Sequence, residues 1–353
     1  MTRCGVVIAA IGVALGALTP APAGAWERGD VHVLAVLPDV APGQPSSVEG
    51  LTVGPDGNIY VPSFGFNTKG QLSGNAALFV IRPDGTLVRK VTIANSSAHM
   101  LGLRFNPVNG FLLVLDFGNG KVLHVDPVTG ASSVFMTPTQ AGAGLNALTF
   151  DKRGNVYVSD SFNGIIWKTG PNGGTPTIWS NSPLLGPGTG LTPPFGANGV
   201  EFNNAGTVMY VANTAFHQII QIAVNPNGTA GAAAIFITGI NGPDGIAVDK
   251  HDNLWVCANQ EDDIIVIDKT GKVTAKLGDF NGISEHGVVR GLLFPASLAF
   301  SLDRKTLYVS NLTLFLPFAG ARAAVDSAWT LEVKRYTVAK LRAAIPPLGD
   351  DEH

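Results

Sequence analysis

A short pattern of alternating apolar and polar residues returns six times along the chain. In the third copy, Leu148 and Phe150 flank Thr149, a polar turn follows at residues 151–155, and a second apolar segment runs over residues 156–158. Alternation with a period of two residues predicts half-buried strands, and the polar clusters between them predict hairpin turns. A third apolar segment, such as residues 165–167, follows a second turn. Each copy therefore predicts three antiparallel strands.

Each copy begins with a variable residue, the lead residue, followed by a small one. The six lead residues are Glu49, Leu101, Asn146, Asn198, Asp244 and Ala296. They are separated by 52, 45, 52, 46 and 52 residues. Strand-rich repeats of about 40–50 residues are typical of a β-propeller with one blade per repeat. We therefore predict an all-β, six-bladed β-propeller that forms a single domain over residues 26–353.

Two further segments predict how the ring of blades closes. A strand is expected at Val31–Leu37, before the first lead residue, and another at Trp329–Val338, after the last. We predict that the N-terminal strand becomes the outer strand of the sixth blade, which would remove an open sheet edge. Residues Ala339–His353 are expected to lie along the surface.

The first 25 residues have the pattern of a signal peptide. Arg3 precedes an apolar run over residues 6–18, and Ala23-Gly24-Ala25 is a small-residue cleavage signal. The run is shorter than the roughly 20 residues that cross a bilayer. We expect cleavage after Ala25 and export to the periplasm or the medium. Cleavage would remove Cys4 and leave Cys257 as the single cysteine, which excludes an internal disulfide.

Composition narrows the range of partners. The chain has 23 basic and 26 acidic residues, a net charge of −3, and no basic block. Nucleic acid and anionic membranes are therefore poor candidates for partners. No other segment is long and apolar enough to span a membrane. We expect a monomer that acts on a small molecule.

The lead residues suggest a metal site. Equivalent positions of blades arranged around one axis form a ring, so the six lead residues should meet at one end of the central channel. Four of them carry side-chain oxygens: Glu49, Asn146, Asn198 and Asp244. Carboxylate and amide oxygens are the ligands that Ca²⁺ prefers, and two carboxylates balance its charge. We predict one Ca²⁺ ion in the channel. Zinc or copper fits less well because no cysteine or histidine cluster accompanies the ring.

Two features of the ring leave alternatives open. Leu101 and Ala296 offer no ligand, so part of the ring is available to water or substrate. Asparagine and aspartate before glycine also commonly form turns through their own backbone. Each of the four polar lead residues, taken alone, is compatible with such a structural role.

The phrases around the polar lead residues resemble the calcium-binding segments of the senescence-marker-protein, or gluconolactonase, family, which includes regucalcin. The phrases are Val48-Glu49-Gly50, Leu145-Asn146-Ala147-Leu148, Ala197-Asn198-Gly199-Val200 and Pro243-Asp244-Gly245-Ile246. The resemblance implies a six-bladed propeller with catalytic Ca²⁺ in its channel that hydrolyses lactones or organophosphate esters. It implies that Glu49, Asn198 and Asp244 bind the metal. It also implies that Asn146 binds metal or contacts substrate, and that Asp244 is the candidate base or nucleophile.

The chain departs from this family at two positions. Family members that act on sugar lactones carry an arginine at the place of Gly144 and often an aspartate at the place of Ala147. A less polar lactone or ester therefore fits better than a sugar lactone. The repeats also resemble NHL-type propellers, many of which only bind partners. The leading hypothesis is an exported Ca²⁺-dependent lactone or ester hydrolase. The alternatives are a non-catalytic propeller that binds a protein or glycan and a structural propeller stabilised by Ca²⁺.

Other residues are weaker candidates. His99, two residues before the second lead position, and His286, in the connection over residues 279–294, are candidate general bases near neutral pH. Insertions at residues 64–74 and 182–195 are expected to form the wall of a pocket. The residues that end the second strands are expected to form turns: Asp116, Asp160, Asn213 and Asn311.

Overall fold

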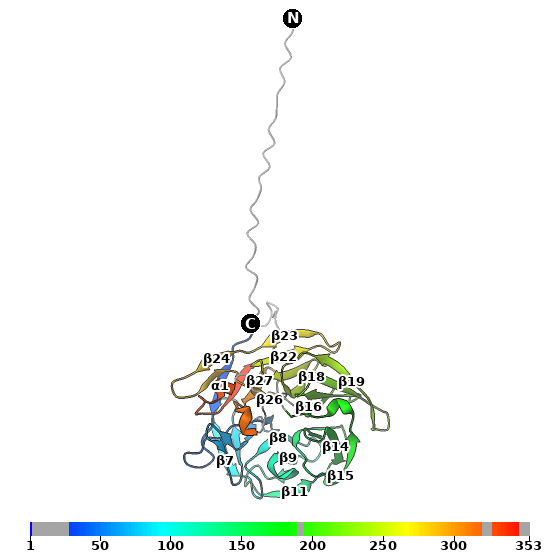
Figure 1. The fold of residues 1–353 in the computed structure, drawn as a ribbon, viewed down its shortest axis with the longest axis horizontal. Coiled ribbons are helices and arrows are strands. Elements are labelled where there is room, and N and C mark those ends of the chain that lie inside the picture. The colour runs from blue at the N-terminus through cyan, green and yellow to red at the C-terminus, as the bar shows by residue number, and fades with distance from the viewer. Residues whose placement is uncertain (2–27, 189–193, 320–326, 346–353) are drawn as a thin grey trace.

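The structure, a computed structural model, describes Met1 and residues 28–188, 194–319 and 327–345 of the chain. Six four-stranded antiparallel sheets are arranged around a central axis, which confirms the predicted six-bladed β-propeller (Figure 1). The predicted signal peptide and the cleavage position after Ala25 fall outside these residues, apart from Met1, and stay predictions. Among the described residues, no helix has the length and hydropathy needed to cross a membrane.

Each blade runs from an innermost to an outermost strand. Blade one is β2 (Thr52–Val53), β3 (Ile59–Pro62), β6 (Ala77–Ile81) and β7 (Leu87–Thr92). Blade two is β8 (Met100–Phe105), β9 (Leu112–Asp116), β10 (Lys121–Val125) and β11 (Ser132–Met136). Blade three is β12 (Leu145–Phe150), β13 (Val156–Asp160), β14 (Ile165–Gly170) and β15 (Gly173–Ser180).

The second half of the ring repeats this order. Blade four is β16 (Ala197–Phe202), β17 (Val208–Asn213), β18 (Gln218–Val224) and β19 (Ala230–Thr238). Blade five is β20 (Pro243–Val248), β21 (Leu254–Ala258), β22 (Asp263–Ile267) and β23 (Val273–Leu277). Blade six is β26 (Pro295–Phe300), β27 (Thr306–Asn311), β28 (Thr337–Arg342) and β1 (His32–Val36).

Blade six closes the ring with both ends of the described chain. β1 pairs antiparallel with β28, and His32 lies opposite Lys340. This confirms the predicted role of the N-terminal strand. The strand predicted at Trp329–Val338 is wrong in its bounds, because a short helix, α1 (Ser327–Thr330), precedes β28. Residues Ala339–Arg342, expected along the surface, belong to β28, and Ala339 and Leu341 are buried.

The apolar faces of neighbouring blades pack against each other and form the core. Trp255 of β21 and Leu298 of β26, for example, belong to one buried cluster between blades five and six. Trp167, Trp255 and Tyr157 are the largest fully buried side chains. Each such cluster joins two blades, so burial of apolar surface holds the ring together all the way round.

The innermost strands are irregular at the lead residues. In blade three the pairing register shifts between Leu145 and Leu148, on either side of Asn146. The same shift occurs around Leu101, Asn198, Asp244 and Ala296. A bulge adds a residue to one strand and turns its side chain out of the regular alternation. The repeated bulge therefore explains how successive blades direct the lead side chain toward the channel.

The small residue after each lead residue allows the innermost strands to approach closely. A Cβ atom on Gly102 would lie 2.8 Å from the carbonyl oxygen of Asn146, and one on Gly245 would lie 2.6 Å from that of Ala296. A Cβ atom on Gly199 would likewise collide with the carbonyl oxygen of Asp244. Glycine is therefore required here by the neighbouring blade rather than by turn geometry.

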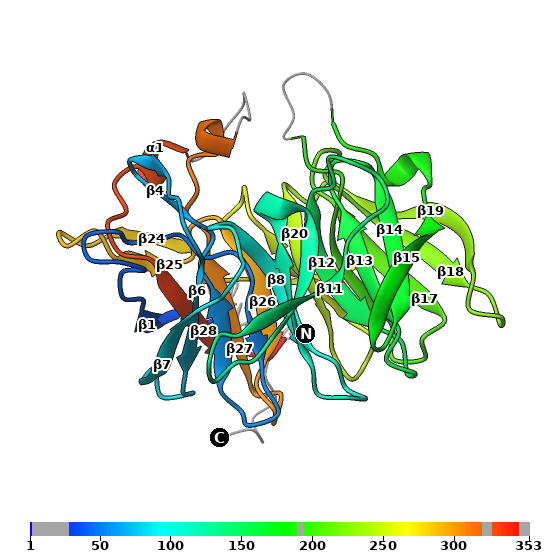
Figure 2. The same ribbon diagram turned by 90° about the horizontal axis from the view of Figure 1, so that it is seen from below.

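Loops within and between the blades gather at one end of the ring. They include the hairpin of β4 (Phe66–Asn67) and β5 (Gly70–Gln71), and the 3₁₀ turns η1 (Phe117–Asn119), η2 (Pro183–Leu185) and η3 (Leu316–Ala319). A further hairpin joins β24 (Phe280–Ile283) to β25 (Val289–Gly291). Figure 2 shows β4 and α1 on the same side of the ring. The functional site lies at this end.

Candidate metal centre

A cavity of about 600 Å³ lies at the end of the channel where the loops gather. Its floor includes all four polar lead residues, Glu49, Asn146, Asn198 and Asp244, together with Leu101. A volume between about 300 and 1,000 Å³ is typical of small-molecule sites. The four side chains that the sequence places in one ring are thus brought together beside an open cavity.

The polar lead residues are buried, yet each has an oxygen without a hydrogen-bond donor. Their exposed fractions are 5% for Glu49, 6% for Asn146, 4% for Asn198 and 4% for Asp244. The unpartnered atoms are Glu49 Oε2, Asn146 Oδ1, Asn198 Oδ1 and Asp244 Oδ1. A buried acceptor left unsatisfied costs about 1–3 kcal/mol, and more when it is charged. Four such atoms lining one cavity indicate a ligand that all of them can contact.

Neighbouring side chains orient two of these oxygens. The amide nitrogen of Asn198 donates to Thr214 Oγ1 at 2.9 Å, and that hydroxyl donates to the carbonyl oxygen of Pro243 at 2.7 Å. Asn259 Nδ2 donates to Asp244 Oδ2 at 3.1 Å. Because these bonds occupy one atom of each group, Asn198 Oδ1 and Asp244 Oδ1 are the atoms left for a ligand.

The two acids of the ring resist ionisation together. Burial raises the pKa of Asp244 to about 7, although hydrogen bonds from Asn259 and Asn198 lower it. Burial, and then the charge of Asp244, raise the pKa of Glu49 well above its ordinary value. Burial and the same two carboxylates raise the pKa of Cys257, so its thiol stays protonated. A bound cation would remove the repulsion between Glu49 and Asp244.

These donors fit a hard divalent cation. Two carboxylates and two amide oxygens are oxygen donors of the kind that Ca²⁺ takes. No group of three His, Cys, Asp or Glu residues able to hold a metal occurs among the described residues, as a zinc site would require. Glu49, Asn146, Asn198 and Asp244 are therefore the residues that could hold the ion.

His99 lies in the same cavity, beside the ring. Its imidazole packs between Phe66, at 4.8 Å between ring centroids, and Phe64, at 6.0 Å. Burial lowers its pKa, opposed by the charge of Asp116. Its Nδ1 atom has no hydrogen-bond partner. A neutral imidazole with a free nitrogen can accept a proton from a bound molecule.

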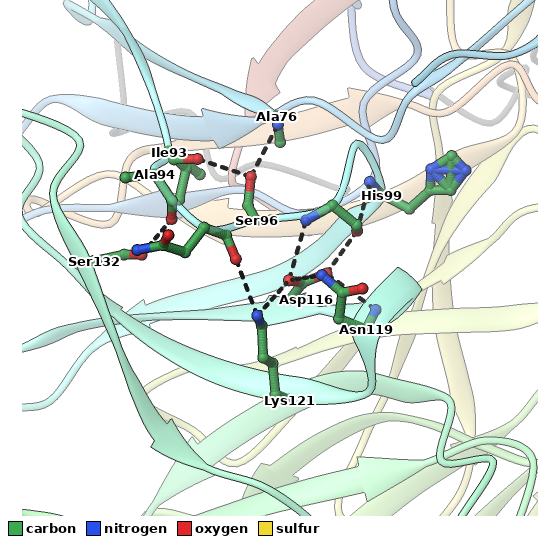
Figure 3. Close-up of polar contacts among 11 residues, drawn as sticks. Ala76, Ile93, Ala94, Ser96, His99, Asp116, Asn119, Lys121 and Ser132 are labelled. Atoms are coloured by element: carbon green, nitrogen blue, oxygen red, sulfur yellow. Dashed lines mark hydrogen bonds and ion pairs between the residues drawn. The ribbon is translucent and has the colours of Figure 1, made fainter. Parts of the chain in front are cut away.

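A buried carboxylate anchors the loop that carries His99 (Figure 3). Asp116 accepts hydrogen bonds from the backbone nitrogen of Ser97 at 3.1 Å and from its hydroxyl at 2.6 Å. The same hydroxyl accepts from the backbone nitrogen of His99 at 3.1 Å. Figure 3 shows the imidazole pointing away from Asp116. Asp116 thus holds the loop and does not touch the ring.

The residues at the ends of the other second strands also anchor loops, as predicted. Asp160 accepts from the backbone nitrogen of Gly144 at 2.9 Å and from Trp167 Nε1 at 3.1 Å. Asn213 donates to the carbonyl oxygen of Leu184 at 2.8 Å. Asn311 accepts from the backbone nitrogen of Leu293 at 3.1 Å. This register fastens each blade to the connection that precedes it.

The structure does not bring His286 to the cavity. It lies in the turn between β24 and β25, its side chain is 82% exposed, and its nearest acid is Glu285 at 3.6 Å. The sequence placed His286 in a connection near the last lead residue. It could not show that the connection forms a hairpin of its own that carries the histidine away from the axis.

Sequence reasoning missed other residues of the cavity, notably Thr214, Asn259, Phe117 and Phe162. A second repeat position would have revealed several of them. The second strand of every blade contains a central valine, and the residue three positions after it is equivalent from blade to blade. In blades one to six these residues are Phe64, Phe117, Ser161, Thr214, Asn259 and Leu312. All except Ser161 line the cavity. Like the lead position, this position supplies equivalent residues to the cavity from successive blades. It is aromatic in blades one and two, polar in blades three to five, and leucine in blade six.

The fold and the ring together define a propeller whose candidate site lies on its axis and is built from oxygen donors. The family described as "SMP-30/Gluconolactonase/LRE-like region" matches residues 192–278, which include Asn198 and Asp244. The chain is thus similar to this family, and the resemblance predicted from the sequence is confirmed.

Individual relatives extend the likeness. A stretch of 136 residues is 28% identical to lactonase drp35 of Staphylococcus aureus, covering 36% of this chain and 39% of that protein. The chain thus spans well under half the length of this relative. A gluconolactonase of Xanthomonas campestris superposes with a TM-score of 0.57 at 14% identity, over 85% of this chain and 87% of the other.

A calcium-binding regucalcin of Agrobacterium tumefaciens gives a TM-score of 0.58 at 18% identity, over 88% of this chain and 94% of the other. At these identities the two structures show that the fold is shared along most of the chain.

Proposed function

We propose that this protein is a Ca²⁺-dependent hydrolase of a neutral lactone or related ester. The single observation that carries the proposal is the set of four unpartnered, buried oxygens facing one cavity, two of them from acids of raised pKa. The similarity to a lactonase and to a gluconolactonase supports the reaction class. The calcium-binding regucalcin neighbour supports the choice of ion.

Each ring residue has a role in this proposal. Glu49, Asn146, Asn198 and Asp244 hold the ion through the oxygens that lack a donor. When held by these oxygens, Ca²⁺ would supply a Lewis acid able to polarise a substrate carbonyl and stabilise negative charge on its oxygen. If Asn146 instead takes the alternative role that the family resemblance implies, its unpartnered Oδ1 contacts the substrate rather than the ion.

The chain also supplies a base for the attacking water. Asp244 Oδ1 accepts the proton from water as the water oxygen bonds to the carbonyl carbon, and Asn259 fixes the carboxylate through Oδ2. The bond between the carbonyl carbon and the ring oxygen then breaks, and the alkoxide takes the proton back from Asp244. His99 Nδ1, which is neutral and unpartnered, is the second group able to carry this proton.

The test is a panel of alkyl and aryl lactones and phosphotriesters, assayed with excess Ca²⁺ and with chelator. We expect turnover that chelator abolishes and Ca²⁺ restores. Asp244→Asn removes the base and a charged ligand at nearly constant volume, so turnover should fall by at least about a thousandfold while the fold persists. Glu49→Gln should weaken metal binding first, and excess Ca²⁺ should partly restore its activity.

Asp84→Asn is the matched control, because Asp84 is an exposed turn residue that accepts from the backbone nitrogen of Thr86. It should retain full activity. The proposal of a Ca²⁺-dependent hydrolase is wrong if no member of the panel is turned over in a metal-dependent way, or if Asp244→Asn is fully active. The binding propeller then becomes the better account.

A further inference from the structure

Part of the wall of the cavity is a continuous arc of aromatic rings. Phe64 contacts Phe66 at 4.9 Å and Phe117 at 6.2 Å between centroids. The arc continues from Phe117 to Phe162 at 5.4 Å and from Phe162 to Phe195 at 5.9 Å. These rings come from loops of blades one, two and three and from the connection between blades three and four, and all five line the cavity.

Aliphatic side chains extend the apolar wall on the other flank. Leu312, Leu314 and Leu316 line the cavity and form one buried cluster with Phe64 and Phe66. The cavity therefore has two parts of different chemistry. One part holds unpartnered oxygens, and the other offers mainly rings and methyl groups, with the imidazole of His99 beside Phe64 and Phe66.

The charges of the cavity exclude an anionic ligand. No lysine or arginine occurs among the described residues that line it. Its acids are Glu49 and Asp244, and His99 is kept neutral by burial. A cation held by the two acids would leave the centre close to neutral. A carboxylate or phosphate on the far part of a ligand would find no positive partner, so the ligand should be neutral there.

The lack of a side chain at Gly144 makes room for the ring of Phe162 in the arc. A Cβ atom on Gly144 would lie 2.6 Å from the ring of Phe162. The absence of a side chain at this position therefore lets the aromatic ring lie over the backbone two residues before Asn146. The ring occupies the space in which a longer polar side chain would otherwise approach the ligand.

We propose that this arc is a subsite for an apolar alkyl or aryl substituent carried by the lactone or ester. The proposal rests on the proposed function and names its substrate class. The carbonyl group meets the ring of oxygens, and the substituent lies against Phe117, Phe162 and Phe195. A sugar lactone, whose hydroxyls need donors and acceptors, would lose hydrogen bonds on entering this part of the cavity.

The experiment uses the full chain and γ-lactones with unbranched alkyl substituents of increasing length, compared with glucono-δ-lactone. Each buried CH₂ group should raise kcat/KM about fourfold until the arc is filled. Glucono-δ-lactone should be turned over more slowly than the octyl-substituted lactone. A flat dependence on chain length, or a preference for the sugar lactone, would overturn the subsite.

Two phenylalanine variants localise the effect. Phe162 is 40% exposed, so Phe162→Ala is not expected to unfold the protein. It should lower kcat/KM for the octyl lactone about tenfold, and by a much smaller factor for unsubstituted γ-butyrolactone, which has no alkyl chain to place against the arc. Phe216 follows the equivalent strand of blade four, is 50% exposed and lies outside the cavity. Phe216→Ala should behave as the unaltered protein, and equal effects of both variants would contradict the assignment.

A binding measurement separates this proposal from the hydrolase proposal. γ-Lactams with the same alkyl series resist hydrolysis and can be titrated by calorimetry with Ca²⁺ present. If no lactone is turned over but lactam affinity rises with chain length and falls in Phe162→Ala, the subsite stands although hydrolysis fails. Lactam affinity that is absent, or independent of chain length, would refute the subsite whatever the enzyme does.

Discussion

At the scale of single residues, the decisive pair is Asp244 and Glu49. Both are buried and have no basic partner among the residues that the structure describes, so the metal-free site cannot easily hold two negative charges. Asp244 has an ordinary pKa of 3.8 and a pKa of about 7 in the fold. Between these values, the folded protein without metal binds more protons than the unfolded chain. Its stability must therefore fall as pH rises through this window.

We expect the free energy of unfolding of the chelated protein to decrease by about 4 kcal/mol between about pH 4 and pH 7. Denaturant titration across this range measures it. Asp244→Asn should reduce the dependence, because the amide has no proton to lose, and the remainder comes from Glu49, whose pKa burial also raises. Calcium affinity should increase over the same range, since protons and the ion compete for the carboxylates. A chelated protein whose stability rises steadily toward neutral pH would contradict this.

The residues of the ring could be predicted because they share one register of a repeat. Four of the six residues at this position are polar and the other two are Leu101 and Ala296, which the sequence shows directly. The aromatic arc could not be found that way, since Phe66 and Phe195 lie in insertions without a repeat partner. The contacts of Phe66 with Phe64 and of Phe195 with Phe162 exist only once the chain is folded into blades around the axis.

At the scale of elements, the innermost strands depend on their small residues. Gly199→Ala would place a methyl group against the carbonyl oxygen of Asp244 in the next blade. We expect a loss of about 2 kcal/mol, typical of overpacking, and a weaker affinity for Ca²⁺ because the strand bearing Asp244 must move.

Gly170→Ala is the matched control for this substitution. Gly170 is also a strand glycine, but the nearest atom to its Cβ would be 3.9 Å away. Its stability should stay within about 0.5 kcal/mol of the unaltered protein. Chemical denaturation and calcium titration test both variants. Equal stability of Gly199→Ala and Gly170→Ala would show that the blades adjust freely.

The closing strand is the second element whose role can be tested. Deleting residues 26–40 removes β1 and leaves the edge of β28 unpaired. We expect the truncated protein to aggregate, because an open edge pairs with other chains. Light scattering at increasing protein concentration measures this. A truncated form that stays monomeric would contradict the role of β1 as a clasp.

Strands that are buried could be predicted from the sequence more accurately than strands that are exposed. The third strand of each of blades one to five is a clear apolar segment in the sequence. β6, for example, is buried along its whole length. The outermost strands of blades one to five were not predicted. β7, for example, is mostly exposed and lacks a clear apolar pattern. The segment from Trp329 was mistaken for a strand because its apolar residues pack against the β24–β25 hairpin, where Trp329 meets Phe280 at 5.9 Å.

At the scale of the whole molecule, the proposed ion joins blades that otherwise touch only their neighbours. Its ligands come from blades one, three, four and five. Binding to the folded state alone stabilises it by about 2.7 kcal/mol at a hundredfold excess over Kd. We expect chelator to lower the melting temperature by about 5 °C and added Ca²⁺ to restore it. A melting temperature that is unaffected, with metal removal verified by elemental analysis, would contradict this.

Ring closure by β1 and β28 has a consequence for the order of folding. Val33 pairs with Ala339, so this contact joins residues that are synthesised some three hundred positions apart. The strands of each of blades one to five follow one another in the chain, interrupted only by the β4–β5 hairpin in blade one, and these blades can form while the ribosome is still adding residues. Blade six cannot be completed until β28 has emerged. Until then the nascent protein is an open arc of five blades. The apolar faces of blades one and five, which blade six covers in the closed ring, are exposed at this stage, and chaperones would be most important for shielding them.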